Sequence, residues 1–219
     1  MNKSIIVIAF LFITGFTVSV SGQINLDFSS GINNSNSKFQ NFGIIATQPR
    51  WGYFFGITPN YQLHEKIKLA IDFQHSVKGF NIDNPNNQTA SAYKFSYLDI
   101  IPEVEYLVSR NLTFGLGINY GLKLSEQSKF KNSAWMNMND FTTIKSTDFG
   151  LTGTLTIFHH NVFGFARYNL GLKNISDVIL TDENGQVSDQ AKQLNRNIQI
   201  GLGYTLNFKK THIPADRQI

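Results

Sequence analysis

The fold is decided by the stretch Leu112-Thr113-Phe114-Gly115-Leu116-Gly117-Ile118-Asn119-Tyr120-Gly121-Leu122-Lys123-Leu124. Its even-numbered residues are all large and apolar, whereas its odd-numbered residues are glycine or polar. This period of two predicts a β-strand whose two faces meet different surroundings. The stretch is longer than the five or six residues of an ordinary strand. It has the length of a tilted strand that crosses a membrane as part of a barrel.

The same alternation recurs along the chain, and the links between the alternating stretches follow a rhythm. Long polar links follow the first, third, fifth and seventh stretches, and short turns follow the second, fourth and sixth. Outer-membrane barrels combine short periplasmic turns with longer external loops. The sequence therefore predicts an all-β fold, an eight-stranded antiparallel up-and-down transmembrane β-barrel. The predicted strands are residues 24–32, 50–61, 67–78, 94–107, 112–124, 147–158, 162–173 and 196–208.

One predicted strand, residues 94–107, breaks the alternation. Phe95 and Tyr97 fall in one phase, whereas Leu98 and Val104 fall in the other, together with Pro102. Proline cannot donate a hydrogen bond within a sheet, and inside a strand it usually marks a bulge or an edge. We therefore predict a β-bulge near Tyr97 and Leu98, because a bulge inserts one residue and reverses the phase.

The ends of the chain are predicted to lie outside the barrel. Residues 1–22 combine Lys3, an apolar run from Ile5 to Phe16, and Val20 and Gly22 as the small residues before a cleavage site. This pattern predicts a secretory signal peptide, and the alternative of a membrane anchor is disfavoured because the run falls short of ~20 residues. The predicted organisation is a signal peptide (1–22), a barrel domain (23–208) and a flexible tail (209–219).

The amino-acid composition excludes several kinds of functional site. The 219 residues contain no cysteine, which excludes disulfides, thiolate metal sites, cysteine nucleophiles and a lipid-anchored N-terminal cysteine. The net charge of +4 is spread along the chain, so nucleic-acid binding has little support. We expect no catalytic site, no cofactor and no metal.

Alternation alone leaves open which face is inside. A soluble eight-stranded barrel of the lipocalin or streptavidin type would turn the apolar face inward. We favour the membrane orientation because the polar face is rich in glycine, alanine and threonine, as a narrow lumen requires. Aromatic residues near the strand ends of the apolar face also match interfacial girdles: Trp51, Tyr61, Tyr106, Tyr120, Tyr204 and Phe208.

The inward-facing set carries charged residues that are predicted to share the lumen. They are Lys68, Asp72, Asp99, Glu103, Glu105, Lys123, Asp148, Arg167 and Lys173. Counting from the short turns places Asp148 beside Lys173 and Glu103 opposite Gly115, with Arg167 in reach of Glu103. These groups could form a proton or ion path or a catalytic acid pair. We favour an ion-paired plug, because eight strands leave a lumen just wide enough for side chains.

Histidines and glycine pairs offer no clear catalytic or nucleotide site. His159 and His160 lie in a predicted turn and His75 has an outward phase, but no Ser–His–acid arrangement is evident. The glycines around Leu116 and Leu202 precede no helix, so they are interpreted as lumen glycines rather than nucleotide-binding motifs.

The third long link contains a cluster of aromatic and methionine residues, Trp135, Met136, Met138 and Phe141. An exposed cluster of this kind could bind a protein partner. It could equally be a hairpin that extends the two flanking strands and packs on itself. Both alternatives stay open at this stage.

Three short segments resemble a known family. The segment Arg167-Tyr168-Asn169-Leu170-Gly171-Leu172-Lys173-Asn174-Ile175 resembles the penultimate strand of the small outer-membrane β-barrel family common in Bacteroidota, whose members include porin-family and OmpX- or OmpA-like barrels. Tyr97-Leu98-Asp99-Ile100-Ile101-Pro102 resembles another strand of that family, with an additional isoleucine, and residues 199–206 resemble its final strand. PorT-like proteins of the type IX secretion system are similar barrels.

The resemblance implies an exported protein in the outer membrane of a Gram-negative bacterium. We expect a monomeric, non-enzymatic barrel with a packed polar lumen and a structural or surface-interaction role. The expected partners are outer-membrane lipid and a protein bound through the external loops. The alternatives are a PorT-like component of a type IX secretion system, a narrow pore for small solutes, and a lipid-acting enzyme.

Overall fold

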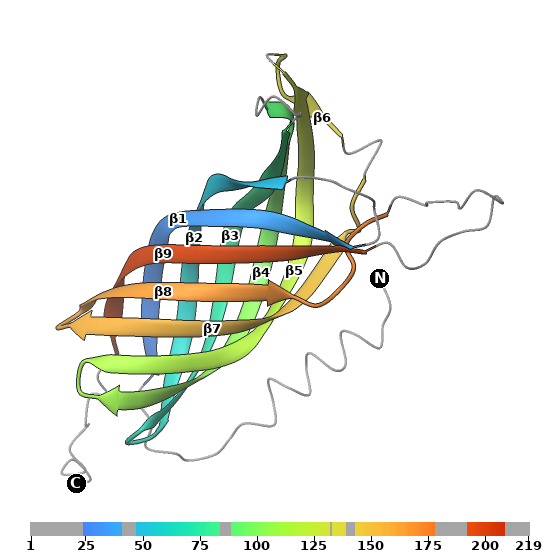
Figure 1. Ribbon diagram of the computed structural model, residues 1–219. Helices are drawn as coiled ribbons and strands as arrows, with labels where there is room; N and C mark the ends of the chain where they lie inside the picture. Colours follow the sequence, from blue (N-terminus) through green and yellow to red (C-terminus); the bar gives the residue numbers. More distant parts are fainter. Residues whose placement is uncertain are drawn as a thin grey trace, which may run out of the picture.

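The computed structural model describes residues 24–40, 47–83, 89–131, 133–138, 143–177 and 192–208 (Figure 1). The predicted signal peptide (1–22) and tail (209–219) lie outside these ranges, and both stay predictions. The strands are β1 (Ile24–Gln40), β2 (Thr47–His64), β3 (Ile67–Asp83), β4 (Thr89–Ser109), β5 (Leu112–Phe130), β6 (Met136–Asn137), β7 (Thr147–His159), β8 (Val162–Gly171) and β9 (Lys192–Asn207).

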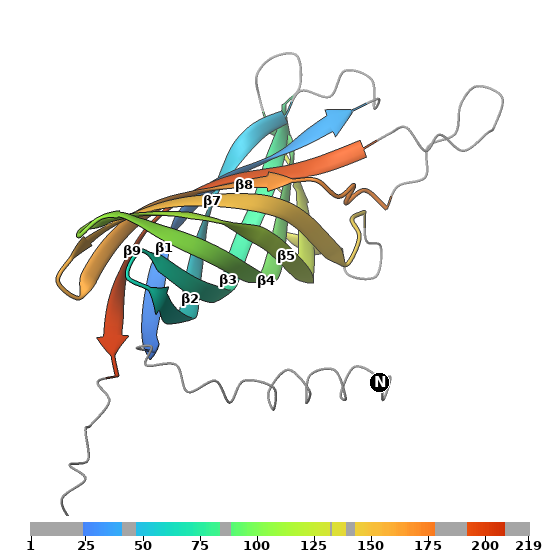
Figure 2. The ribbon, with the colours of Figure 1, turned by 90° about the horizontal axis from the view of Figure 1, so that it is seen from below.

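The eight long strands close into a ring. Their order is β4-β3-β2-β1-β9-β8-β7-β5, and β4 also pairs with β5, so each long strand has a neighbour on both sides. All of these pairs are antiparallel, and β1 and β9 run next to each other where the first and last strands meet (Figure 2). Closure satisfies the backbone groups that an open sheet edge would expose to hydrocarbon. The predicted up-and-down barrel is confirmed.

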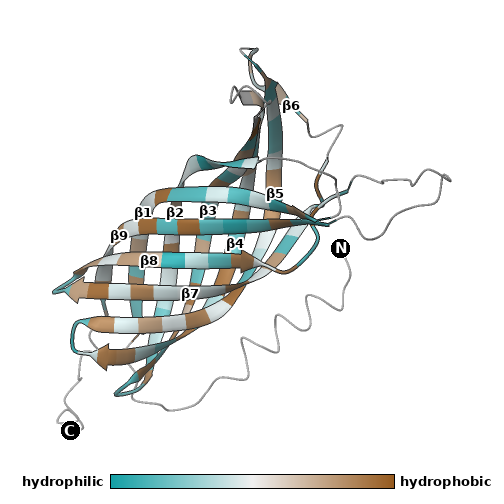
Figure 3. Ribbon diagram, in the orientation of Figure 1, coloured by the Kyte–Doolittle hydropathy of each residue, from teal (hydrophilic) through white to brown (hydrophobic). Residues whose placement is uncertain are grey.

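The apolar face of the wall is the outer one. Leu116 is 58% exposed and Leu202 68%, whereas Gln74 and Asp99 on the inner face are fully buried. Apolar and polar residues follow one another along the strands (Figure 3). The structure thus excludes the inverted, soluble barrel. The expected girdle residues lie on this outer face: Trp51, Tyr106, Tyr120, Tyr204 and Phe208 are exposed, and Tyr61 is half-buried.

The external ends of the strands extend beyond their predicted limits. β1 continues to Gln40 instead of ending at residue 32, and β5 continues to Phe130 instead of ending at residue 124. The two-residue strand β6 was not predicted. Alternation marks a strand only where one face meets lipid, and these extensions lie beyond the apolar part of the wall. The alternation of apolar and polar residues therefore stops before the strand ends.

The predicted bulge was placed on the wrong strand. Tyr97 pairs with Lys123 and Ser96 pairs with Ser125, so the extra residue is Leu124 of β5. The register between β3 and β4 is unbroken from Ile67 to Ile82. Phe95 and Tyr97 therefore share the inward phase of Asp99, and both are buried. Their apolar character suggested an outward phase because the sequence does not show that the lumen itself contains an aromatic layer.

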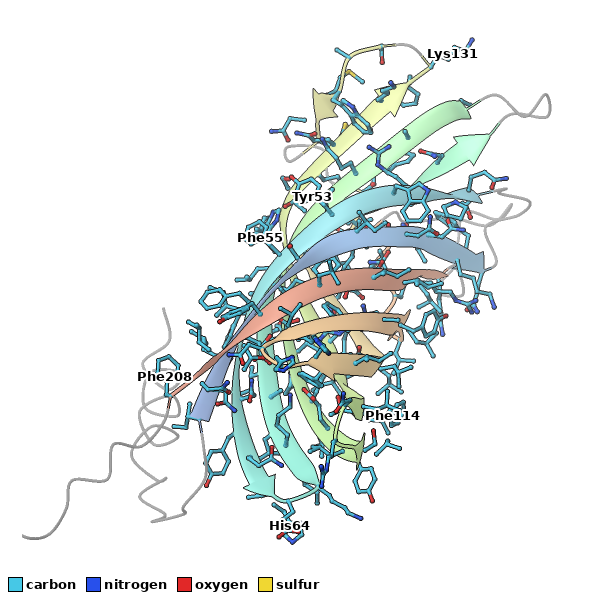
Figure 4. All side chains as sticks on the ribbon, turned by 90° about the vertical axis from the view of Figure 1, so that its left-hand side faces the viewer. Tyr53, Phe55, His64, Phe114, Lys131 and Phe208 are labelled. Carbon is cyan, nitrogen blue, oxygen red and sulfur yellow. The ribbon has the colours of Figure 1, made fainter. Side chains whose placement is uncertain are left out.

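The two ends of the barrel differ. Figure 4 places His64, the last residue of β2, at one end, and Lys131, beyond β5, at the other. Short turns identify the His64 end as periplasmic and the Lys131 end as external. The described residues include no helix of the length and apolarity that a membrane span requires.

The outward position of Leu116 gives a test of the orientation. We expect Leu116→Arg to lower the free energy of unfolding in lipid by roughly 2–4 kcal/mol, because an arginine near the bilayer centre must leave water. Ala134→Arg is the matched control, since Ala134 is exposed on the external hairpin. Urea unfolding midpoints in vesicles measure both variants, and equal midpoints would contradict this orientation.

Candidate functional site

The periplasmic end of the lumen contains a polar cavity of about 250 Å³. Asp27, Lys68 and Arg110 contribute charged side chains to its wall. Lys68 forms a buried ion pair with Glu105 at 2.8 Å, and its ammonium group lies 5.2 Å from the ring centroid of Phe158. Two of the charges predicted in the lumen, Lys68 and Glu105, are therefore paired with each other.

Arg167 of β8 joins two carboxylates in the middle of the lumen. Its Nη1 donates to Oδ2 of Asp72 at 2.6 Å, and its Nη2 donates to Oε2 of Glu103 at 3.0 Å. Nε donates to the Thr154 hydroxyl at 3.0 Å, and that hydroxyl donates to the second oxygen of Glu103 at 2.6 Å. All four side chains are buried. This charge-assisted network spans β3, β4, β7 and β8 and so cross-links opposite parts of the wall.

The predicted approach of Arg167 to Glu103 is present, but the predicted register was wrong. Glu103 pairs with Gly117, and Glu105 pairs with Gly115. The difference arises because β4 continues to Ser109, which makes the turn to β5 shorter than predicted. A glycine still provides the space: a Cβ on Gly117 would lie only 2.7 Å from Cγ of Glu103.

An aromatic cluster interrupts the polar interior that was predicted. Phe54, Phe163 and Phe165 are buried inside the barrel, with ring centroids of Phe54 and Phe165 5.7 Å apart. The guanidinium carbon of Arg167 lies 5.4 Å from the Phe165 centroid. A Cβ on Gly201 would lie 2.7 Å from both the Phe54 and Phe165 rings. Glycine in the wall therefore makes room for phenylalanine in the lumen.

A second group of charges lies toward the external end. Asp99 accepts hydrogen bonds from Lys78 at 2.8 Å and from the Ser76 hydroxyl at 2.6 Å. Asp148 accepts from the Asn195 amide at 2.8 Å. Each of these carboxylates is nearly inaccessible to solvent, so these partners replace the water that the carboxylates lose.

Lys173 does not form the contact that its predicted position suggests. The register is the expected one, since Gly150 pairs with Gly171, but β8 ends at Gly171. The Lys173 ammonium group donates to the Thr147 hydroxyl, and within the described residues no ion pair joins it to Asp148.

The external end of the lumen is closed by a packed cluster. Phe80, Phe95 and Tyr97 from β3 and β4 contact Ile144 and Ile175 from the segments before β7 and after β8. All five side chains are buried, and an isolated bridge from Ile144 to Ser176 holds the two segments together. We call these five residues the external plug.

Lys123 and Glu126 anchor the external plug. They form an ion pair at 2.9 Å, and Lys123 also donates to the carbonyl of Ile144 at 2.6 Å. Glu126 accepts from the backbone amide of Thr143 at 3.1 Å. The loop that carries Ile144 is thus held by charge-assisted hydrogen bonds from β5.

The charge prediction omitted three buried members of this interior, Asp27, Lys78 and Glu126. Lys78 lies at the outer limit of a predicted strand, and its inward phase could have placed it beside the other charges. Glu126 lies after the bulge at Leu124, where counting from the short turn gives the opposite face. The alternation of the sequence was enough to place Lys78 inside the barrel. Glu126 could be placed inside only by knowing that a bulge at Leu124 reverses the phase of β5.

The external hairpin comprises the end of β5 and β6, residues 125–138. Gln127 pairs with Asn137 and Ser128 with Met136, so the Trp135 cluster lies in a hairpin. The hairpin is formed by β5 and β6, since β7 begins only at Thr147, and binding of a partner stays a prediction. Met136 is 45% exposed, whereas Trp135 and Met138 are half-buried. Phe141 lies outside the described residues.

The histidines occupy two different places: His75 is separated from the lumen charges, whereas His160 lines the periplasmic cavity together with Asp27 and Lys68. His75 lies on the outer wall, with its Nε2 2.7 Å from the hydroxyl of Ser96 and its ring stacked 5.0 Å from Phe55. The Nδ1 atom of His75 has no hydrogen-bond partner within the described residues. His159, the last residue of β7, contacts His160 in the exposed turn that follows. Among the described residues, no group of three histidine or acidic side chains could hold a metal ion.

The family model for the outer membrane protein beta-barrel domain matches residues 16–177. The chain belongs to this family. This membership and the closed ring of strands locate the protein in the outer membrane. The search among curated proteins found no match.

Solved outer-membrane barrels are similar to this outer membrane protein at low identity. Ail of Yersinia pestis, in complex with the heparin analogue sucrose octasulfate, is 14% identical, with 84% of this chain and 99% of that chain covered and a TM-score of 0.48. OprG of Pseudomonas aeruginosa is 12% identical, with coverage of 84% and 96% and a TM-score of 0.45. The outer membrane protease OmpT of Escherichia coli is 12% identical, with coverage of 88% and 100% and a TM-score of 0.42.

The lumen network of the outer membrane protein gives a stability test. We expect Arg167→Ala to lower the free energy of unfolding by about 3–5 kcal/mol, because it leaves the buried carboxylates of Asp72 and Glu103 without a counter-charge. Arg110→Ala is the control, since Arg110 is exposed at the periplasmic end. Urea unfolding in lipid vesicles measures both variants.

A triple variant separates charge from packing. Arg167→Met combined with Asp72→Asn and Glu103→Gln removes every charge of the network, so part of the lost stability should return. An Arg167→Ala midpoint equal to that of the wild type would show that these ion pairs do not hold the barrel together.

Proposed function

We propose that this outer membrane protein is a non-conducting, non-enzymatic barrel that presents its external hairpin to a protein partner outside the cell. The observation that carries the proposal is a lumen filled by side chains from the Lys68–Glu105 pair to the external plug. A barrel of this kind acts through its outer surface and its loops rather than through its interior.

The cavities of the lumen support the absence of conduction. Besides the periplasmic cavity of about 250 Å³, the lumen contains a cavity of about 30 Å³ lined by Arg167 and one of about 10 Å³ lined by Asp148. A single water molecule needs roughly 10–15 Å³ of such space. The inner cavities therefore hold at most a few isolated waters, and the external plug lies beyond them. Through the described part of the lumen, these cavities offer a hydrated ion no continuous water-filled path.

The external hairpin supports a role in surface contacts. The outward apolar face of β5 ends at Leu124, yet the strand continues to Phe130, so its last residues stand beyond the membrane. Phe130 and Met136 are 51% and 45% exposed there. Apolar side chains that stay exposed to water are characteristic of interaction sites.

The geometry around His75 supports a role without catalysis. A serine nucleophile needs a histidine that is itself oriented by a third group, usually a carboxylate. His75 contacts Ser96, but among the described residues no acid reaches its Nδ1 atom. The carboxylates of the lumen lie on the other face of the wall.

The closed ring also supports a monomer. Each long strand already has a neighbour on both sides, so none of them offers a free edge to a second chain. A partner must therefore bind through loops, the hairpin or the outer wall.

Electrical recording tests the closed lumen. We expect the wild-type protein in a planar lipid bilayer to give no resolved conductance steps, because the packed side chains leave no continuous water column. A wide porin inserted in the same membrane is the positive control. Reproducible single-channel steps from the purified protein would support the pore alternative instead.

Site-specific photo-crosslinking tests the partner surface. A photoreactive residue in place of Met136 is expected to form a protein adduct on intact cells, whereas one in place of Leu116 is expected to label lipid. Mass spectrometry identifies the adducts. Secretion-machine subunits in the Met136 adduct would favour the export alternative, and the absence of any protein adduct would refute the proposed surface role.

A further inference from the structure

Three cationic side chains converge on Trp135, the single tryptophan of the external hairpin. The guanidinium carbon of Arg50 and the ammonium nitrogen of Lys94 each lie 4.7 Å from the ring centroid of Trp135. The ammonium nitrogen of Lys129 lies 5.9 Å from the same centroid. The four residues come from β2, β4, β5 and the segment before β6, so the fold, not the local sequence, brings them together. We call them the cationic cluster.

The cationic cluster lies on the outer surface of the wall. Phe95 and Ser128 are each 1% exposed and point into the barrel, so their strand neighbours Lys94 and Lys129 point outward. Arg50 reaches the same area, because a Cβ on Gly79 would lie 3.0 Å from its Cδ, and Gly79 pairs with Lys94.

This position borders the apolar part of the wall. Leu98 lies four residues from Lys94 on the same face of β4 and is 37% exposed, and Trp51, which follows Arg50, is 64% exposed. The cluster is also on the side of the external hairpin. It is therefore located where the headgroups of the outer leaflet begin.

The positive charge of the cluster has no acidic counterpart in the part of the chain that the structure describes. No described carboxylate forms an ion pair with Arg50, Lys94 or Lys129, and the Nε atom of Arg50 is buried without a hydrogen-bond partner. The face of the Trp135 ring attracts these cations but carries no net charge. Three cations around one ring repel one another, and a multivalent anion would relieve that repulsion.

We infer that the cationic cluster binds the phosphate group of a phosphorylated lipid in the outer leaflet. The Arg50 guanidinium and the two ammonium groups supply charge-assisted hydrogen bonds to the phosphate oxygens. The exposed apolar wall below the cluster accommodates the acyl chains of the same lipid. Lys129 and Trp135 belong to the external hairpin, so this lipid site adjoins the partner surface at Met136.

Trp135 provides a spectroscopic signal for the test. The chain contains two tryptophans, so a Trp51→Phe background leaves Trp135 as the reporter. The folded protein in zwitterionic micelles is titrated with bis-phosphorylated lipid A, and the emission of Trp135 is recorded. We expect a saturable change that weakens as salt concentration rises, because screening reduces the attraction between exposed charges.

Two double variants test the residues. Lys94→Gln with Lys129→Gln removes two cluster charges, and we expect the half-saturating lipid concentration to rise by at least about tenfold. Lys131→Gln with Lys145→Gln removes the same net charge outside the cluster and should leave that concentration unchanged. Arg50→Gln should also weaken binding. Urea midpoints verify that each variant is folded.

Two further titrations identify the ligand. Lipid A without its phosphates should not produce the change, and inorganic phosphate at the same concentration should not saturate it. Equal binding of the dephosphorylated lipid would overturn the inference in favour of apolar contact alone. Saturation by inorganic phosphate would point to a free-anion site, and equal losses in both double variants would show attraction by net charge only.

Discussion

Every backbone amide and carbonyl of this protein that lies in hydrocarbon must find its partner within the wall. The ring satisfies this constraint because β4 pairs with β5 and β1 pairs with β9. Closing only eight strands fixes a narrow bore, and a narrow bore must be filled by side chains. The dense packing of the interior follows from that closure.

The interior meets two demands that oppose each other. Filling the bore requires bulk, which the phenylalanines around Phe165 provide, and it also brings charged groups out of water. The charged groups that lose water are stabilised by ion pairs. Arg167 bridges two carboxylates, and Lys78 and Lys68 each form an ion pair with one carboxylate. Glycine at Gly117 and Gly201 supplies the space on the facing wall. Small residues in the wall and large ones in the lumen are two aspects of the same packing.

The barrel could be predicted from the sequence because lipid imposes a strict alternation on the part of each strand that it touches. The approach of Arg167 to Glu103 could be predicted for the same reason, since phase and strand order place both inside. The bulge at Leu124 could not be predicted. Phe95 and Tyr97 are apolar and therefore suggested a lipid-facing phase, whereas both side chains fill the lumen. The cationic cluster could not be predicted either. The sequence shows Trp135 only as one member of an aromatic and methionine cluster, and its three cationic neighbours come from strands whose external ends have no alternating pattern.

The lumen is open at one end and packed at the other. Asp27, Lys68 and Phe158 line both the large periplasmic cavity and the small one that reaches Arg167, whereas Phe80, Phe95 and Ile144 close the external side. In the proposed non-conducting barrel, ions and protons reach the described part of the interior from the periplasm. The acidity and ionic strength of that compartment then set the charge state of the core.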